Sequence, residues 1–197
     1  MEISRPKSNQ PLPDNAVCVF KGKIFDTYQW EQKMYDGSIK IFEKLKRPDT
    51  VVIFPVLDDG KILLSLQEQP GKEPYIAGFG GRMDEGEKIL DAAKRELLEE
   101  TGYVASEYVL WKAKHPNSKI DYVVYFFIAK NCKIVSEQIL DGGEKIDLIS
   151  VTFDEFLQKA RDKKFMEKEI IPDMYEALID PRKYVELKKL FSESASV

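Results

Sequence analysis

Residues 81–102 read GRMDEGEKILDAAKRELLEETG, and this stretch decides the fold. Apolar residues recur within it at four-residue spacing, namely Ile89, Ala93 and Leu97. That spacing puts them on one face and predicts a helix over residues 88–101 that is anchored in a core. Gly102 follows at the position where a glycine commonly ends a helix. The sequence therefore predicts one buried helix, preceded by a glycine-containing loop.

The predicted helix carries three acidic residues on a second face. Glu96, Glu99 and Glu100 stand at i, i+3 and i+4, so their carboxylates meet on the helix surface. Like charges at this spacing each cost roughly 0.2–0.5 kcal/mol, and the end of a helix favours cations by about 0.3–1 kcal/mol. A hard divalent cation reverses this balance, because magnesium prefers oxygen ligands. The pattern indicates a magnesium site, with a solvated acidic helix as the alternative.

The loop before the helix is dense in glycine. Gly80 and Gly81 allow the backbone to approach a ligand closely, and a bare carbonyl there could add a metal ligand. Glutamate pairs alone are common on solvated helices, but beside this loop they favour a functional site.

The fixed residues of this region form a pattern that resembles the complete signature of the Nudix hydrolases. Five residues separate the first glycine from a glutamate, and seven more precede an Arg-Glu-Leu triplet. A Glu-Glu pair and a final glycine complete the pattern after single-residue gaps. Tyr103 departs from it, because an aliphatic residue is more usual there. The matching positions are Gly81, Glu87, Arg95, Glu96, Leu97, Glu99, Glu100 and Gly102.

The resemblance implies a metal-binding role for the acidic face of the helix. Glu96, Glu99 and Glu100 would bind Mg²⁺, for which Mn²⁺ can substitute. The Gly80 carbonyl would be a further ligand. The cofactor expected from the resemblance is therefore a divalent cation held mainly by carboxylates.

The resemblance gives the other signature residues an architectural role. Glu87 and Arg95 are too far apart in sequence for a same-face pair on one helix, and the resemblance implies that they bridge the loop to the helix. Gly81 would shape the loop, and Gly102 the end of the helix.

The surrounding sequence predicts an α/β protein. From the resemblance we expect a Nudix α/β/α sandwich with a mixed sheet over residues 48–165, preceded by a small antiparallel sheet within residues 1–47. Asp36-Gly37 is expected to form the hairpin turn of that small sheet. Residues 166–197 are expected to form a helical tail that breaks near Asp180-Pro181.

Periodicity and turn residues predict the other elements. Residues 69–74 are expected to form a turn between strands, and residues 154–163 a helix. Strands are expected at residues 50–57, 61–67, 104–114, 121–129 and 145–151.

The composition is that of an ordinary globular protein. The 197 residues are 43% hydrophobic, and the formal net charge of −4 gives no general attraction to nucleic acid or anionic membranes. Two cysteines, Cys18 and Cys132, are too few for a disulfide scaffold. No signal peptide or membrane-spanning run is visible. We therefore expect a cytoplasmic protein that binds neither nucleic acid nor a membrane. The resemblance implies a small-molecule nucleotide as its substrate.

More of the chain resembles one branch of the family, the ADP-ribose and nucleoside-diphosphate-sugar pyrophosphatases. Aromatic-bearing strands precede the predicted core, residues 141–151 form a characteristic block before a helix, and a helical tail closes the chain. The resemblance implies a homodimer formed through the N-terminal sheet, in which Trp30 or Tyr28 stacks on the base of the substrate. Core packing is the alternative for either aromatic residue.

The general base has three candidates. In this branch an acidic residue in the loop before the last core strand acts as base or metal ligand, which points to Glu144 or Asp141. Glu99 of the helix is the third candidate. Arg82, beside the loop glycine, could hold a phosphate oxygen. His115 lies outside the signature and is assigned no catalytic role.

The predicted reaction is metal-dependent hydrolysis of the diphosphate bond in ADP-ribose or a nucleotide sugar, giving a nucleoside monophosphate and a sugar phosphate. Alternative substrates are a nucleoside triphosphate, a dinucleoside polyphosphate or an RNA cap, and a non-catalytic ligand sensor is a further alternative. Residues 67–70 lack the basic residue usual in the branch, and Pro116 lies closer to the signature than the proline often seen in ADP-ribose hydrolases. The resemblance therefore specifies the reaction more closely than the substrate.

Overall fold

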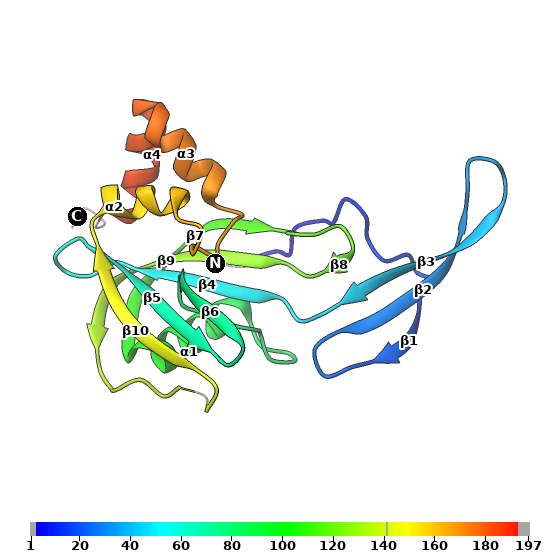
Figure 1. The fold of residues 1–197 in the computed structure, drawn as a ribbon, viewed down its shortest axis with the longest axis horizontal. Coiled ribbons are helices and arrows are strands. Elements are labelled where there is room, and N and C mark those ends of the chain that lie inside the picture. Colours follow the sequence, from blue (N-terminus) through cyan, green and yellow to red (C-terminus); the bar gives the residue numbers. More distant parts are fainter. Residues whose placement is uncertain (1–2, 141, 193–197) are drawn as a thin grey trace.

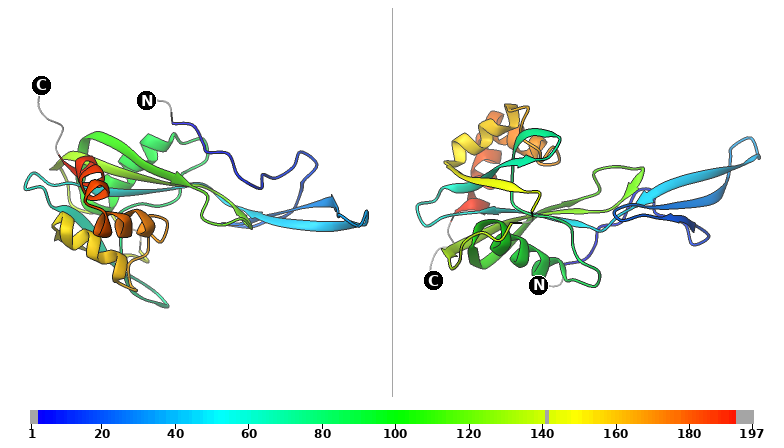
Figure 2. Two further views of the ribbon diagram at one scale, coloured as in Figure 1. Left: turned by 90° about the horizontal axis from the view of Figure 1, so that it is seen from above. Right: turned by 60° about the horizontal axis from the view of Figure 1, so that its bottom comes forward.

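The computed structural model describes residues 3–140 and 142–192. A central body of strands carries helices on two opposite sides, and a sheet of N-terminal strands projects from one end of the body (Figure 1). Helix α1 (Ile89–Thr101) covers one side, and the C-terminal helices cover the other (Figure 2). The predicted α/β/α sandwich with a small preceding sheet is confirmed. The C-terminal helices are α2 (Phe153–Gln158), α3 (Ile171–Ile179) and α4 (Pro181–Phe191).

One half of the body is a sheet in the order β4–β9–β7. β4 (Thr50–Pro55) pairs parallel with β9 (Val124–Ile134), and β9 pairs antiparallel with β7 (Tyr103–Lys114). The first part of β9, with the sequence VYFFIA, is buried because a continuous apolar run suits a strand covered on both faces. The parallel and antiparallel pairs together give the mixed sheet that the sequence predicts.

The other half of the body is an antiparallel sheet in the order β10–β5–β6. Strand β6 contradicts the expectation that residues 69–74 form a turn. The turn uses only Pro70 and Gly71, whose φ of +76° suits glycine, so Lys72 pairs at once with Gln69. The β5–β6 hairpin leads directly into the glycine loop and positions it. The strands are β10 (Lys145–Val151), β5 (Ile62–Gln69) and β6 (Lys72–Ala77).

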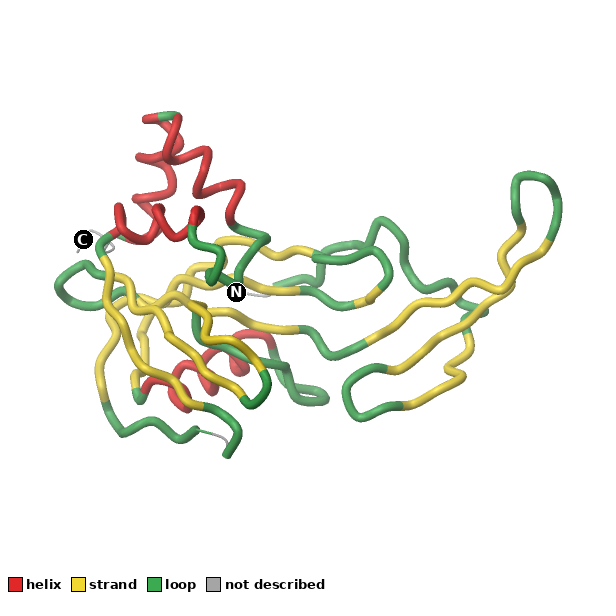
Figure 3. The backbone as a smooth tube through the Cα atoms, in the orientation of Figure 1, coloured by secondary structure: helices red, strands yellow, loops and turns green. Residues whose placement is uncertain are grey.

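The projecting N-terminal sheet follows the prediction with one correction. β1 (Val17–Lys21), β2 (Asp26–Lys33) and β3 (Ile39–Lys46) pair antiparallel, and the turn after β2 includes Gly37 with a φ of +85°. A short strand β8 (Ile120–Asp121) pairs parallel with β3, so the sheet is not purely antiparallel. This happens because the loop after β7 returns beside β3. The chain then passes from β3 into β4 through a short loop that joins this sheet to the body (Figure 3).

The C-terminal helices share the core of the body. Met174 and Ala177 of α3 are buried in one cluster with Leu187 and Phe191 of α4 and with residues of β4 and β5. Within the described ranges no helix is long and apolar enough to cross a membrane.

The ends of these helices have local causes. Asp180 ends α3, and its side chain accepts the Arg182 N–H at 2.9 Å at the start of α4, so the predicted break near Asp180-Pro181 is confirmed. The helix expected over residues 154–163 is shorter, because α2 passes into a 3₁₀ turn at Lys159–Arg161.

Candidate active site

Helix α1 is fixed against the body by its apolar face. Ala92, Ala93 and Leu97 are fully buried in a cluster with residues of β4 and β9. Gly102 ends the helix with a φ of +71° and donates its N–H to the Leu98 carbonyl at 2.8 Å, as the sequence predicts. The same helix carries the three acidic residues of the signature, Glu96, Glu99 and Glu100.

The loop glycines bring the backbone against two of these carboxylates. Gly80 has a φ of +149°, and a Cβ there would lie 2.0 Å from the Val51 carbonyl oxygen. The Gly80 N–H donates to Glu100 Oε2 at 2.7 Å. At Gly81 a Cβ would lie 2.6 Å from Glu96 Oε1, so a side chain there would displace this carboxylate. The close approach of loop and helix therefore requires glycine at Gly80, whereas a side chain at Gly81 would need the Glu96 carboxylate to move.

Arg95 joins the loop to the helix. Its guanidinium makes two hydrogen bonds to Glu87, from Nε to Oε1 at 2.9 Å and from Nη2 to Oε2 at 3.0 Å. Nη1 donates to Glu96 Oε1 at 2.8 Å and to Glu99 Oε2 at 3.1 Å, and Nη2 donates to the Arg82 carbonyl at 3.2 Å. The hydrogen bonds with Glu87 raise the pKa of Arg95 and lower that of Glu87. Glu87 and Arg95 thus form a loop-to-helix bridge of the kind the resemblance implies.

Two of the helix carboxyl groups are buried enough to resist ionisation. Burial raises the pKa of Glu100 to about 8, although the hydrogen bond from Gly80 acts in the opposite direction. The negative charges of Glu96, Glu144 and Glu99 raise it further. Burial also raises the pKa of Glu96. A bound cation would favour the ionised form of both carboxyl groups.

The acidic residues fit a hard divalent cation by their chemistry. Carboxylate oxygens are the ligands that Mg²⁺ and Mn²⁺ prefer, and each of the three glutamates keeps one oxygen that bonds no described residue. However, no set of three or more His, Cys, Asp or Glu side chains in residues 3–140 and 142–192 already surrounds a common point. The carboxylates do not converge as their spacing led us to expect, because Arg95 binds Glu96 and Glu99 while Glu100 turns to Gly80.

The loop before β10 brings Glu144 to the same region. Its negative charge raises the pKa of both Glu96 and Glu100, so it lies near them. Glu144 is half-buried and lines a cavity of about 430 Å³ between this loop and the β5–β6 turn. Asp141, the other loop candidate for the base, lies outside the described residues.

The residues predicted to bind the substrate are not gathered at α1. Arg82 is exposed, and burial together with the Arg82 charge lowers the pKa of Arg47, which places these two cations near each other. Trp30 is only 6% exposed, and its ring centroid lies 5.9 Å from that of Phe42. Tyr28 is half-buried on the same strand, β2. Within one chain, β2 lies in the projecting sheet and away from α1 (Figures 1 and 2).

Two buried polar residues near the site were not predicted. Glu167 Oε1 accepts the Gly78 N–H at 3.1 Å, and burial raises the pKa of Glu167 to about 8. Tyr75 donates its hydroxyl to Gln67 Oε1 at 2.6 Å, and burial followed by the Glu100 charge raises the pKa of Tyr75. No sequence signal marks either residue, because Glu167 lies in an irregular segment and Tyr75 directly follows residues 69–74, for which the sequence predicts a turn.

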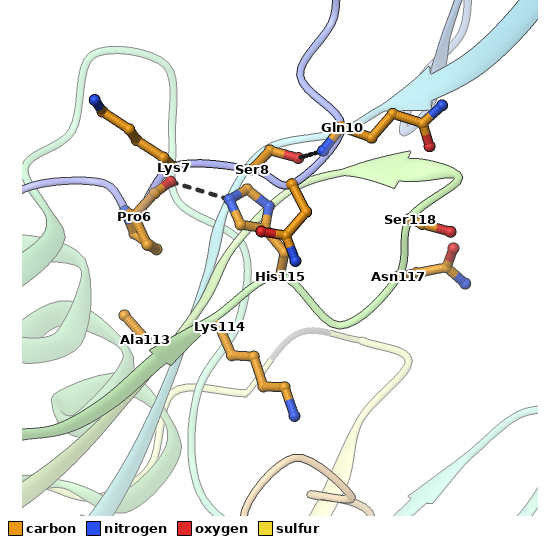
Figure 4. A pocket seen from close by; sticks show the side chains of 10 residues that line it. Pro6, Lys7, Ser8, Gln10, Ala113, Lys114, His115, Asn117 and Ser118 are labelled. Carbon is orange, nitrogen blue, oxygen red and sulfur yellow. Dashed lines mark hydrogen bonds between the residues drawn. The ribbon is translucent and has the colours of Figure 1, made fainter.

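A separate cavity of about 290 Å³ lies between the N-terminal segment and the end of β7 (Figure 4). His115 Nε2 lies 3.0 Å from the Pro6 carbonyl oxygen at its wall. The Lys7 and Lys114 side chains extend away from the imidazole (Figure 4). These two cations therefore do not converge on one point, and the signature residues lie elsewhere.

Known proteins resemble this chain in sequence and in fold. The NUDIX domain family model matches residues 46–174. The ADP-ribose pyrophosphatase of Bacillus subtilis (strain 168) is 28% identical over 149 residues, which cover 74% of this chain and 80% of that protein. The ADP compounds hydrolase NudE of Escherichia coli (strain K12) is 28% identical over 142 residues, which cover 68% and 73%.

A solved structure gives the same result for the architecture. The crystal structure of an ADP compounds hydrolase superposes with a TM-score of 0.70 at 20% identity, covering 93% of this chain and 98% of that one. At this identity the likeness shows the fold. The family model spans well over half of the chain and includes the whole loop–helix signature. The chain therefore belongs to the Nudix family and is a Nudix hydrolase that acts on pyrophosphate bonds.

Proposed function

We propose that this Nudix hydrolase cleaves the diphosphate bond of ADP-ribose or a nucleotide sugar, giving a nucleoside monophosphate and a sugar phosphate. The observation that carries the proposal is the buried acidic cluster of α1, in which burial raises the pKa of Glu100 to about 8 beside the glycine loop. The relatives named for ADP-ribose and ADP compounds support the choice of an ADP-containing substrate.

We propose Mg²⁺ as the cofactor, replaceable by Mn²⁺, with Glu96, Glu99, Glu100 and the Gly80 carbonyl as ligands. Such a cation neutralises the diphosphate oxygens and acidifies the attacking water when it is bound. Arg95 restrains Glu96 and Glu99 from one side, so their free oxygens are held in limited orientations. Glu87 in turn orients Arg95 through two hydrogen bonds.

Glu144 is our choice for the general base, which takes a proton from the attacking water. It is half-buried, lines the cavity beside the acidic cluster and influences the pKa of Glu96 and Glu100. Glu99 is the second candidate. Its side chain is 42% exposed and is bound to Arg95, which makes it less free to accept a proton.

The cavity beside Glu144 is our proposed site for the phosphate-bearing half of the substrate. Lys72 and Lys145 line it. Lys145 is paired with Glu68 at 3.0 Å, whereas the Lys72 ammonium lies over the Tyr75 ring, 3.6 Å from its centroid, and forms no ion pair within the described chain. Lys72 is therefore the better placed cation for a phosphate oxygen. Arg82, the cation predicted from the sequence, remains a second proposal.

We also propose a homodimer formed through the projecting sheet. Val17, Phe20, Ile39 and Ile41 are each more than 60% exposed there, and their burial against a second chain would stabilise a dimer. In such a dimer, Tyr28 or Trp30 of one chain would meet the substrate bound by the other. Tyr28 is the better placed of the two, because Trp30 is packed against Phe42.

A substrate panel tests the proposed function. Purified protein with Mg²⁺ is offered ADP-ribose, GDP-mannose, UDP-glucose and a nucleoside triphosphate, and the products are separated by chromatography. We expect a nucleoside monophosphate and a sugar phosphate from ADP-ribose or a nucleotide sugar, and no turnover when the cation is chelated. Preferred cleavage of the triphosphate would contradict the proposed substrate class, and turnover in excess chelator would contradict the proposed cofactor.

A further inference from the structure

A segment far from the signature runs beside strand β6. The Ile76 N–H donates to the Lys164 carbonyl at 2.9 Å, and the Met166 N–H donates to the Ile76 carbonyl at 2.9 Å. These bonds belong to a short parallel ladder in which Ile76 faces Phe165. The regular continuation of a parallel ladder would bond the Gly78 N–H to the Met166 carbonyl.

At Gly78 the Glu167 side chain replaces the main-chain acceptor of this ladder. The Met166 carbonyl instead accepts the Lys168 N–H at 2.8 Å, because the chain turns there. The Gly78 N–H donates to Glu167 Oε1 at 3.1 Å. A carboxyl oxygen therefore replaces the main-chain carbonyl that would otherwise satisfy this amide.

Gly78 is held from its other sides as well. Ser65 Oγ lies 3.2 Å from the Gly78 carbonyl oxygen and 3.0 Å from that of Ala77, and it accepts a hydrogen bond from Gln67 Nε2 at 3.0 Å. A Cβ on Gly78 would lie 2.7 Å from Val52 Cγ1. The backbone at Gly78 thus has little room to move while Glu167 is in place.

Glu167 is a costly way to satisfy one amide. Its Oε2 is buried and has no hydrogen-bond partner among the described residues, and burial raises its pKa to about 8. Buried polar atoms without partners are uncommon, and each calls for an explanation.

The position of Gly78 bears directly on the active site. Phe79 and Ile53 exchange two main-chain hydrogen bonds, of 2.9 and 2.6 Å, so the next residue is locked to β4. The Gly80 N–H then donates to Glu100 Oε2 at 2.7 Å. A shift of the backbone at Gly78 would be passed through Phe79 to the partner of the Glu100 carboxylate.

We infer that Glu167 is a positioning residue of the hydrolase: by accepting the Gly78 N–H, it sets the backbone at Gly80 and, through it, the orientation of the Glu100 carboxylate. This inference rests on the proposed function for its catalytic consequence. Its structural part, the restraint of residues 78–80, stands independently of any substrate.

Three variants test the inference by kinetics. Glu167→Ala removes the acceptor, and we expect kcat to fall roughly 10- to 100-fold with KM changed by less than about threefold, because a small displacement at an active site is enough for such a loss. Glu167→Gln keeps an acceptor oxygen and should retain kcat within about threefold. Glu169→Gln removes a neighbouring acid that does not contact Gly78 and serves as the matched control.

Amide hydrogen exchange tests the same inference without cation or substrate. Exchange at residues 78–80 should be faster in Glu167→Ala and close to that of the unmodified protein in Glu167→Gln and Glu169→Gln. If Glu167→Ala does not fold, Glu167→Met fills the space without offering an acceptor oxygen and takes its place. Circular dichroism establishes that each variant is folded.

The outcomes separate the competing roles. Equal loss of kcat in Glu167→Ala and Glu167→Gln would overturn the inference, because the carboxyl itself would then be needed. A raised KM with unchanged kcat would also overturn it and would make Glu167 a substrate contact. Unchanged exchange at residues 78–80 in Glu167→Ala would show that Glu167 does not restrain this backbone. If the protein hydrolyses no substrate of the panel, the proposed function fails, while the exchange measurement still decides whether Glu167 restrains this backbone.

Discussion

The loop–helix region around α1 and the projecting N-terminal sheet differ in how far their side chains find partners within one chain. In the first region the interacting groups lie within the glycine loop and the helix: Arg95 binds Glu87, Gly80 binds Glu100, and Gly102 ends the helix. In the second, every residue of β1 is exposed, including the apolar ones.

This difference shows which parts of an enzyme a short motif can specify. The signature encodes a helix, its end and its contacts with the preceding loop, so its interactions are local in sequence. The projecting sheet forms its hydrogen bonds but leaves the side chains of Val17, Phe20, Ile39 and Ile41 exposed to solvent. The site should therefore depend most on the signature and less on the sheet.

The largest effect is expected from Glu100→Gln in the loop–helix region around α1. Loss of the carboxylate should reduce kcat at least about 100-fold, because a proposed cation ligand is removed while the amide still accepts the Gly80 N–H. Folding should be preserved, since the pKa of Glu100 is raised by burial to about 8 and the variant removes that acid. Steady-state kinetics and a thermal melt measure both effects.

The matched control is Glu85→Gln, which removes an exposed acid from the same loop. It should change kcat by less than about twofold, as surface substitutions usually do. Turnover of Glu100→Gln at the level of this control would show that the acidic cluster of α1 is not the metal site.

The next effect concerns the loop before β10, which lies outside the signature but reaches the same region. Glu144→Gln should lower kcat roughly 100-fold in steady-state kinetics, which lies within the usual contribution of a general base. Asp147→Asn, an exposed acid on β10, is the control. A greater loss in Glu99→Gln, with Glu144→Gln near the unmodified rate, would assign the base to the helix.

A smaller effect is expected from the projecting sheet. Ile41→Lys places a charge on its exposed apolar surface and should convert a dimer to a monomer, as measured by light scattering after gel filtration. If β2 of a partner contacts the base, KM should rise about tenfold while kcat falls less, since base stacking is worth roughly 1–3 kcal/mol.

The control for the dimer is Ile179→Lys, which alters an apolar residue of α3 that is 81% exposed and lies on another part of the molecule. This variant should leave the association state unchanged. If the unmodified protein is a fully active monomer, the proposed homodimer is wrong, because the projecting sheet would then need no partner chain.

The same contrast explains how much of the structure was predictable. The helix over residues 88–101 and its end at Gly102 follow from periodicity and a glycine, so they were predicted almost to the residue. Strand β6 was missed because Pro70 and Gly71 suggested a longer turn than the two residues it needs. Strand β8 was missed because two residues carry no periodicity.

The candidate site divides in the same way. Glycine at 81 and the Glu87–Arg95 bridge follow from the signature, whereas the distribution of the glutamate oxygens does not. Spacing alone places Glu96, Glu99 and Glu100 together, but Arg95 and Gly80 determine where their oxygens point. That choice depends on contacts between loop and helix, which periodicity does not describe.

The smallest effect is expected at Glu167, a residue that is distant in sequence but buried beside Gly78. It tests whether the loop–helix region around α1 extends to this residue. Burial raises the pKa of Glu167 from 4.5 to about 8, so between these values the folded protein keeps a proton that the unfolded chain loses. This stabilisation is fully present below pH 4.5 and is lost as pH rises toward 8, by an amount on the order of a few kcal/mol.

Urea unfolding at pH 5, 6.5 and 8 should show a steeper fall in the unfolding free energy for the unmodified protein than for Glu167→Gln. Glu100 contributes a fall of the same sign in both proteins and cancels in the difference. Glu85→Gln, which removes an exposed acid of the glycine loop, should follow the unmodified curve. Parallel curves for Glu167→Gln and the unmodified protein would mean that this carboxyl ionises without penalty, and the region fixed around the active site would then end at the glycine loop.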